Sequence, residues 1–174
     1  MTGSPAPSTS PRAAARPAQV AKIVSFALGD DLFAADIFSV ERVLRHEAPT
    51  VVPNAPEWIE GVIEYLGRVV PVVNLRRRFG LAAVPVQPQT RILVLKSGAE
   101  WVGVVVDAVV EVTSFDATQL SPPPSLFRGL AGEYLKGIVR RSDRLLILLD
   151  VERLLAATEA LHLAPDGGEA TPHA

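Results

Sequence analysis

The chain of 174 residues contains no cysteine, which excludes disulfide bonds, thiolate nucleophiles and metal sites built from cysteine. No apolar run approaches the roughly 20 residues needed to span a bilayer. The richest stretch, Val102 to Val110, is interrupted by Asp107. The N-terminus lacks the compact apolar segment of a secretory signal. We therefore expect a cytoplasmic protein.

An excess of charge of either sign is also missing. The formal net charge is -2, so no strong field attracts the protein to nucleic acid or to an anionic membrane. Aromatic residues make up only 6% of the chain, fewer than a nucleic-acid-binding barrel needs for base stacking. Hydrophobic residues reach 48%, which is enough for a substantial core.

Groups for catalysis or metal binding are few and scattered. The three histidines, His46, His162 and His173, form no His-x-x-x-His motif and no cluster with carboxylates. No glycine-rich loop opens a helix to hold a phosphate. Asp107, inside an apolar run, is either a buried functional acid or a residue that binds backbone groups at a strand end. The sequence therefore predicts no metal, no cofactor and no enzyme.

Both ends of the chain are rich in proline, alanine and other small residues. Such segments bury too little apolar surface to offset the entropy of ordering, so residues 1–20 and 164–174 are predicted to be disordered tails. Residues 21–163 form the predicted domain.

Within this domain, short β-branched and apolar runs alternate with turn residues such as Gly29-Asp30-Asp31, a pattern typical of an all-β barrel or sandwich. The predicted strands are Lys22–Leu28, Leu32–Ile37, Gly61–Tyr65, Arg68–Val73, Arg91–Lys96, Trp101–Val106, Ala108–Ser114, Tyr134–Arg140 and Arg144–Leu149. Two helices are expected, one capped by Asn74 and ending at Gly80, the other starting at Asp150 and ending near Ala160. The arginines 76–78 and 140, 141 and 144 are interpreted as solvated basic faces.

An internal repeat relates the two halves of the domain. The segment from Arg68 recurs from Arg144, an offset of 76 residues, and Gly61-Val62-Ile63 recurs as Gly137-Ile138-Val139 at the same offset. Further upstream, Lys22-Ile23-Val24 matches Arg91-Ile92-Leu93 at an offset of 69, and Val40-Glu41 matches Val110-Glu111 at 70. Two similar small barrels follow. Neither would have enough core to be stable alone, so we expect one cooperative unit.

The same segments carry a recognisable series of motifs in order. They are Phe26-x-Leu-Gly-x-x-x-Phe33-x-x-x-Ile37-x-x-Val40, Val52-Pro53-Asn54-Ala55-Pro56, Ile59-x-Gly61-Val62-Ile63, Gly67-x-Val-Val-Pro71-Val-Val-Asn-Leu75-Arg76, Thr90-Arg91-Ile92, Val102-Gly103-x-x-Val-Asp107-x-Val109, Pro122-Pro-Pro, Tyr134-Leu-x-Gly137 and Leu146-Ile-Leu-Leu-Asp150-Val-Glu. Together they resemble the CheW domain over about residues 22–163.

The resemblance implies a mostly β fold of two SH3-like five-stranded barrels with short helices, one of them C-terminal. It implies a chemotaxis adaptor with no catalytic centre. Its partners would be the regulatory domain of a CheA-like histidine kinase, the hairpin tip of a chemoreceptor's cytoplasmic coiled coil, and other CheW-like proteins. The adaptor would be recruited to receptor arrays. Carried over to this chain, the protein-binding residues are Val40, Arg42, Gly61, Leu66, Gly67, Val69, Thr90, Val109 and Val112.

Two of these positions depart from the family pattern. Leu66 stands where the family usually has an interacting arginine, and Arg42 stands where a glutamate is common. Leucine cannot supply the bidentate hydrogen bonds of arginine. A divergent adaptor dedicated to a particular partner is therefore expected. A CheW-like protein that regulates or localises surface motility or another machine, without activating a kinase, stays an alternative, as does a β-barrel enzyme or nucleic-acid binder.

Overall fold

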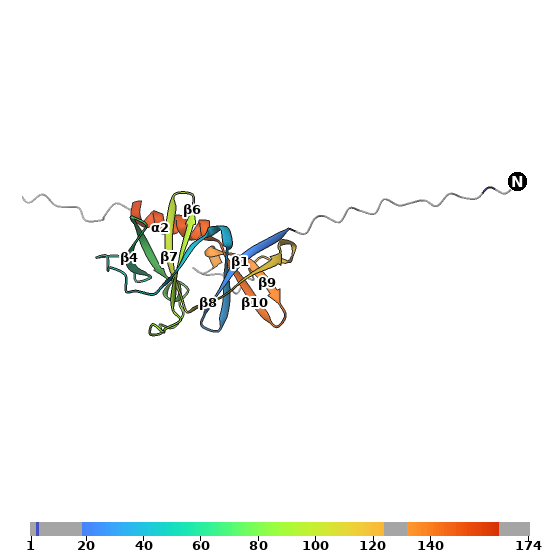
Figure 1. The fold of residues 1–174 in the computed structure, drawn as a ribbon, viewed down its shortest axis with the longest axis horizontal. Helices are drawn as coiled ribbons and strands as arrows, with labels where there is room; N and C mark the ends of the chain where they lie inside the picture. Colours follow the sequence, from blue (N-terminus) through green and yellow to red (C-terminus); the bar gives the residue numbers. More distant parts are fainter. Residues whose placement is uncertain (1–2, 4–18, 124–131, 164–174) are drawn as a thin grey trace, which may run out of the picture.

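The computed structural model describes residues 3, 19–123 and 132–163, and strands dominate it (Figure 1). One five-stranded sheet contains β1 (Val20–Leu28), β2 (Asp31–Asp36), β8 (Ala108–Asp116), β9 (Leu135–Arg141) and β10 (Arg144–Leu149). The other contains β3 (Val40–Arg45), β4 (Ile59–Tyr65), β5 (Arg68–Asn74), β6 (Arg91–Ser97) and β7 (Glu100–Val106). The helical elements are α1 (Leu75–Arg78), α2 (Val151–Leu163) and the short turns η1 (Ile37–Ser39), η2 (Ala117–Gln119) and η4 (Gly132–Tyr134). The predicted class, mostly β with two five-stranded barrels and a C-terminal helix, is confirmed.

The strand orders are β8-β1-β2-β10-β9 and β3-β6-β7-β5-β4. The two orders become identical when each strand is matched with the strand whose number differs by five, such as β1 with β6. The sequence repeat is therefore a structural repeat. Its halves do not correspond to the barrels, however. Hairpin β1–β2 of the first half completes the barrel of β8, β9 and β10, and hairpin β6–β7 of the second half completes the barrel of β3, β4 and β5. The two halves thus exchange their first hairpins, which the sequence did not predict.

Strand register corrects one detail of the predicted repeat. Val40 pairs with Leu95, and Val109 pairs with Phe26, so the offset from β3 to β8 is 69 rather than 70. The difference arises from a β-bulge in each strand: Glu41 is the extra residue of β3, and Val110 is the extra residue of β8. A bulge increases the local twist of a strand and helps a small sheet to curl into a barrel.

The largest buried cluster draws on both sheets and both helices. It contains Phe26, Leu28, Phe33, Ala35, Val73, Leu75, Leu93, Leu95, Val102, Val104, Val106, Tyr134, Leu135, Ile147, Leu149, Val151, Leu154 and Leu155. Phe79, which follows α1, stacks on Phe33 of the other barrel with ring centroids 5.5 Å apart. A smaller cluster around Ile23, Phe115 and Leu146 fills the interior of the first barrel. Because the two barrels bury their apolar faces against each other, the surface that stabilises one also stabilises the other.

Each predicted strand is present with its ends shifted by at most two residues, and β3 is an additional strand. Its charged residues, Glu41, Arg42 and Arg45, obscure a simple alternation of apolar and polar positions. The repeat contained the missing signal, because β3 matches the predicted strand Ala108–Ser114. Asn74 caps α1 as predicted, because its side chain accepts a hydrogen bond from the backbone N–H of Arg77. Asp150, directly before α2, accepts one in the same way from the backbone N–H of Arg153 in the first turn of that helix.

The ends of the chain lie almost wholly outside the described residues. The predicted tail 164–174 is not among them, and of the predicted tail 1–20 the structure describes residues 3, 19 and 20. Val20 already belongs to β1, so the ordered domain begins before residue 21. Among the described residues, no helix combines the length and the hydropathy that crossing a membrane requires.

Candidate functional site

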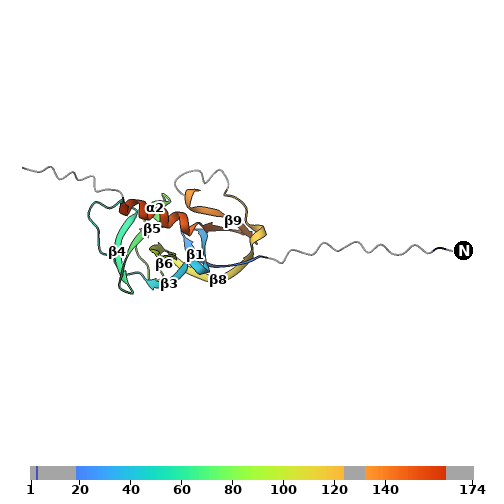
Figure 2. The same ribbon diagram turned by 90° about the horizontal axis from the view of Figure 1, so that it is seen from above.

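Four of the predicted protein-binding residues lie on two edge strands, Val40 and Arg42 on β3 and Val109 and Val112 on β8. Both strands begin where the chain passes from one barrel to the other. Figure 2 shows them on the same side of the molecule, with α2 on the opposite side. Val40 and Val109 pack, partly buried, against the core that the barrels share. We call residues 40–43 of β3 and 109–112 of β8 the seam surface.

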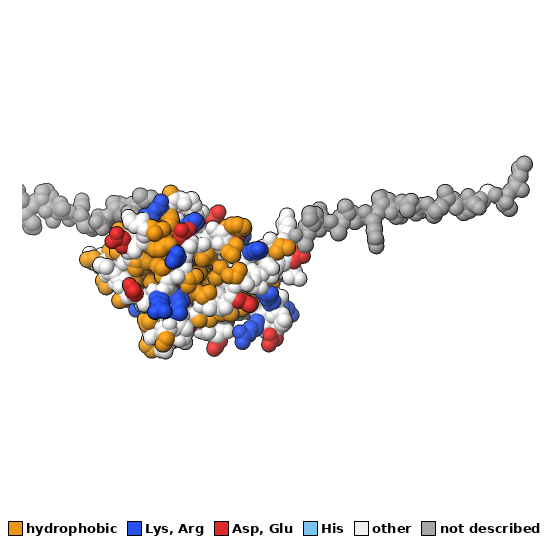
Figure 3. All heavy atoms as spheres, in the orientation of Figure 1, with side chains coloured by type: hydrophobic (Ala, Val, Ile, Leu, Met, Phe, Trp, Pro, Cys, Tyr) orange, Lys and Arg blue, Asp and Glu red, His pale blue; other side chains and the backbone are white. Residues whose placement is uncertain are grey.

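The seam surface exposes more apolar side chain than the sequence indicated. Val112 is 62% exposed, and two valines that were not predicted, Val43 and Val110, are 41% and 53% exposed. Figure 3 shows hydrophobic side chains gathered over the middle of the face on which β8 lies. Large contiguous apolar patches on soluble proteins are characteristic of interaction sites. The repeat could have predicted Val43, because Val43 is the counterpart of the predicted residue Val112. Val43 pairs with Leu93, and Val112 pairs with Val24, the residue equivalent to Leu93.

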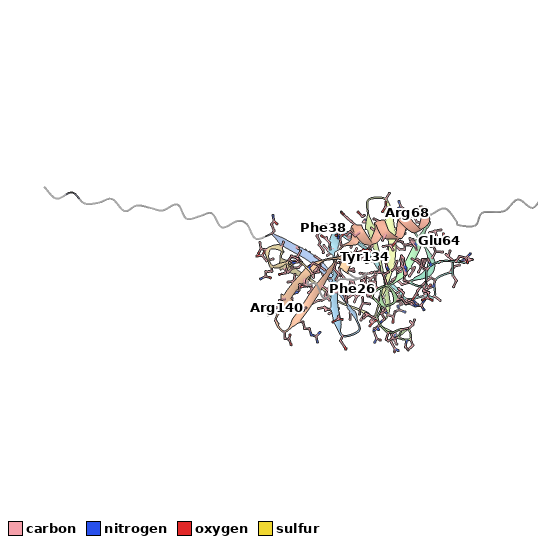
Figure 4. All side chains as sticks on the ribbon, turned by 180° about the vertical axis from the view of Figure 1, so that it is seen from behind. Phe26, Phe38, Glu64, Arg68, Tyr134 and Arg140 are labelled. Carbon is pink, nitrogen blue, oxygen red and sulfur yellow. The ribbon has the colours of Figure 1, made fainter. Side chains whose placement is uncertain are left out.

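A second set of predicted residues lies at the β4–β5 turn. Leu66 and Gly67 both have positive φ, 49° and 74°, as a two-residue hairpin turn of the primed type requires. Leu66 and Val69 are each 72% exposed, and we call these two side chains the hairpin-tip surface. The hairpin is held in place by Arg68, whose guanidinium lies 4.7 Å from the Trp101 ring centroid and donates to the carbonyl of Ala99. Glu64 and Arg68 lie towards one end of the molecule in Figure 4.

Gly61 is buried, and its role in the structure is to let the second barrel close. A Cβ at this position would lie 2.1 Å from the carbonyl oxygen of Thr50, and the φ of 148° is one that only glycine adopts freely. Thr50 and Val62 exchange two backbone hydrogen bonds of 2.9 and 2.8 Å beside it. Gly137 repeats the arrangement in the first barrel, with Ser121 in the place of Thr50.

Thr90 does not join either surface. It is buried just before β6, where its Oγ1 accepts a hydrogen bond of 2.9 Å from the backbone N–H of Gln87. Its own N–H donates to the carbonyl of Gln87. Thr90 therefore fixes the turn that leads into β6.

Asp107 lies at the junction of β7 and β8 and ties three segments together. Its carboxylate accepts hydrogen bonds from Arg76 Nε at 2.8 Å and Nη2 at 2.5 Å, and from the backbone N–H of Gly29 at 2.8 Å. These bonds, with Arg76 foremost, hold the pKa of the Asp107 carboxyl below its ordinary value, and they raise the pKa of Arg76. Of the two interpretations left open, the structure supports the residue that binds backbone at a strand end, with an ion pair added.

The arginines of α1 do not form the solvated face that we expected. Arg76 is engaged with Asp107, and Arg78 lies between two aromatic rings, 4.7 Å from the centroid of Trp58 and 4.9 Å from that of Tyr134. Arg78 also donates to the Tyr134 hydroxyl, and Figure 4 places Tyr134 near the middle of the molecule. Only Arg77 is exposed. The ion pair with Asp107 explains why Arg76 turns inward, and cation–π contacts in a partly desolvated site explain the same for Arg78.

His46 lies in the loop after β3, and its Nε2 is 3.3 Å from Glu60 Oε2. Glu60 is the bulge residue of β4, and its other oxygen accepts a hydrogen bond from Asn74, the cap of α1. Within residues 19–123 and 132–158, whose side chains are described, no three His, Asp or Glu residues come together in a way that could hold a metal ion.

Known proteins resemble this chain over most of its length. A family model described as CheW-like domain matches residues 22–159, which include parts of all ten strands. The chain is 37% identical over 134 residues to the Chemotaxis protein CheW of Klebsiella aerogenes, covering 77% of this chain and 81% of that protein. It is 33% identical over 152 residues to Protein FrzA of Myxococcus xanthus, covering 86% and 93%. The crystal structure of scaffolding protein TtCheW from Thermoanaerobacter tengcongensis matches with a TM-score of 0.68 and 33% identity, covering 74% of this chain and 83% of that one.

Proposed function

This chain belongs to the CheW family of chemotaxis scaffold proteins, and from this premise we propose that it couples a chemoreceptor to a CheA-like histidine kinase. It does so by holding its partners in place and carries out no chemistry of its own. Its place of action is the cytoplasm, at receptor arrays.

One observation carries the proposal: the predicted contact residues that are exposed fall on two separate surfaces. The seam surface lies where the barrels meet, and the hairpin-tip surface lies at the β4–β5 turn of one barrel. An adaptor that bridges two proteins needs two such surfaces. The core shared by both barrels keeps them in a fixed relation, so a partner on one surface is held at a defined position relative to a partner on the other.

The seam surface suits the hairpin tip of a receptor's coiled coil. Exposed valines on β3 and β8 present two short apolar ridges, and an amphipathic helical hairpin carries a matching apolar stripe on each arm. The base of this surface is firm, because Val40 and Val109 are packed on the shared core.

The hairpin-tip surface suits the regulatory domain of the kinase. Leu66 and Val69 are exposed on a hairpin that the Arg68–Trp101 contact holds in place, so little conformational entropy is lost when a second protein covers it. Leu66 replaces a charged contact by an apolar one. We therefore propose that the cognate kinase presents an apolar group there, which makes this adaptor selective for its own kinase.

The experiment separates the two surfaces by single substitutions. Val112→Glu is expected to abolish binding of a receptor hairpin fragment while binding to the kinase regulatory domain persists, and Leu66→Glu is expected to do the reverse. Val86→Glu, at a 58% exposed valine in the loop before β6, is the matched control and should leave both interactions unchanged. If both substitutions affect the same partner, or neither affects any, the two-surface adaptor is wrong.

A second candidate function follows from the departures at Leu66 and Arg42. A CheW-like protein with altered contacts could regulate or localise surface motility or another machine without activating a kinase. Reconstituted kinase activity with and without this protein, in the presence of receptor fragments, distinguishes the two. Stimulation supports the coupling role, and binding without stimulation supports the second candidate.

A further inference from the structure

The seam surface is built from two equivalent halves. Each apolar position on β3 has a counterpart on β8. The strand register shows this, because β3 valines pair with residues of β6, and β8 valines pair with the equivalent residues of β1. The equivalent pairs are Val40–Leu95 with Val109–Phe26, and Val43–Leu93 with Val112–Val24. An antiparallel helical hairpin also has two similar arms. On apolar contacts alone, such a hairpin could therefore dock in either of two opposite orientations with similar affinity.

The charges of the two halves are not equivalent. Arg42 on β3 corresponds to Glu111 on β8, and both side chains are exposed. Further along, exposed Arg45 corresponds to exposed Ser114. The β3 half is therefore the more basic one and the β8 half the more acidic one.

The neighbouring charges reduce this difference without removing it. On the β8 half, exposed Arg141 of β9 donates a hydrogen bond of 2.7 Å to Thr113 Oγ1 and so adds one positive charge near Glu111. The bulge residue Glu41 is paired with Lys96 at 2.5 Å, so the two together add no net charge to the β3 half, and its counterpart Val110 is uncharged. Lys22 and Arg91, at equivalent positions of β1 and β6, carry the same sign on both sides. The contrast thus depends chiefly on Arg42 and Glu111.

We propose that Arg42 and Glu111 determine which way round the partner hairpin docks on the seam surface. This inference rests on the proposed function, since it takes a receptor-type helical hairpin as the partner. The arm that lies against β3 carries acidic residues, and the arm that lies against β8 carries basic ones. In the reverse orientation both arms would meet like charges, and electrostatic complementarity of this kind selects between binding modes that apolar contacts leave equal.

The absence of cysteine allows a direct test by disulfide cross-linking. Single cysteines are introduced in the full-length chain at Val43→Cys, on the β3 half, or at Val112→Cys, on the β8 half, both at exposed positions. The probe is the cytoplasmic hairpin fragment of a chemoreceptor from the same organism, with a single cysteine in one arm or in the other. The cysteine at position 43 is expected to cross-link to one arm at least about fivefold faster, and the cysteine at position 112 to the other arm, since about 1 kcal/mol per exposed pair corresponds to this ratio.

The double variant Arg42→Glu with Glu111→Arg is expected to lose or reverse this preference. The affinity itself should change little, because the exchanged charges complement the hairpin in its opposite orientation and the apolar contacts are similar in both. The matched control is Glu64→Arg with Arg140→Glu, a second pair of exposed, oppositely charged residues at equivalent positions, on the hairpins β4–β5 and β9–β10 (Figure 4). This control keeps the net charge and should leave the cross-linking pattern unchanged.

The outcomes distinguish the inference from the function on which it rests. Equal cross-linking of both arms to each cysteine, or a preference that survives the Arg42/Glu111 exchange, overturns the orientation rule while the docking site stands. A fragment that binds the chain but cross-links to neither position contradicts the seam surface as the docking site, and the orientation rule with it.

Discussion

Substituting Gly61 by alanine is expected to open the second barrel. The new methyl group would lie 2.1 Å from the Thr50 carbonyl oxygen, so the bridge between Thr50 and Val62 must separate. Two backbone hydrogen bonds are then lost, each worth about 1 kcal/mol. An alanine held at a φ of 148° adds strain of about 1–3 kcal/mol. The free energy of unfolding should fall by about 3–5 kcal/mol, a large part of the 5–15 kcal/mol typical of a domain.

Urea unfolding monitored by tryptophan fluorescence measures this loss, and Trp58 is a suitable reporter because it lies directly before β4. Gly67→Ala is the matched control. Gly67 also has a positive φ of 74°, but a Cβ there meets no atom within 4 Å, so its cost should be only about 1 kcal/mol. Equal destabilisation by both substitutions would show that barrel closure does not depend on Gly61. Gly61→Ala should also weaken both partner interactions together, because it acts through the fold.

Three further predictions follow from the contacts between elements. Asp107→Asn should lower the free energy of unfolding by about 2 kcal/mol at neutral pH. Because the pKa of this carboxyl is depressed in the folded state, the difference from wild type should vanish as the pH falls through the folded-state pKa. Urea titrations across the acid range would reveal this. Arg78→Leu introduces the residue that Leu154 provides at the equivalent position of the repeat, and it should change the free energy of unfolding by less than about 1 kcal/mol. Arg78→Ala should lower it by about 2–3 kcal/mol, because it leaves a void beside Trp58. A larger loss with leucine than with alanine in thermal unfolding would contradict this. Leu66→Arg should shift kinase selectivity in pull-down assays without altering the unfolding curve, and unchanged partner choice would refute the specialised hairpin tip.

Local patterns were sufficient to predict most of the fold. The turn Gly29-Asp30-Asp31 and the caps Asn74 and Asp150 each act within a few residues, so the sequence predicts the hairpins and helix starts that they create. The repeat of Gly61 at Gly137 predicted two similar barrels because both glycines permit the same close approach of backbone.

The pairing of strands across the two halves could not be predicted in this way. Whether β1–β2 joins β3–β5 or β8–β10 depends on long-range packing, such as Phe79 on Phe33, and an amphipathic hairpin suits either barrel equally. The same holds for the seam surface. A valine pattern predicts a strand, but only the register and the neighbouring sheet decide that Val40 is half-buried and Val112 is exposed.

The predicted site residues include buried and exposed positions, which the sequence alone does not distinguish. Gly61 and Thr90 are buried and hold backbone segments together, whereas Leu66, Val69 and Val112 are exposed. The inward orientation of Arg78 was missed because its aromatic neighbours, Trp58 and Tyr134, are distant in sequence. Trp58 and Tyr134 are 76 residues apart, which is the offset of the repeat, and this spacing was the one sign in the sequence that the two rings occupy equivalent positions.

The exchanged hairpins have a consequence for how this protein can be divided. A cut in the exposed loop of residues 82–89 would yield two fragments, each holding a hairpin that the other requires. Neither piece could satisfy its strand edges alone, yet mixing them would restore every pairing. An ancestral polypeptide of half this length would likewise have completed its barrel only with a second copy of itself, and fusion of the two genes would have turned that dimer into a single interlocked chain.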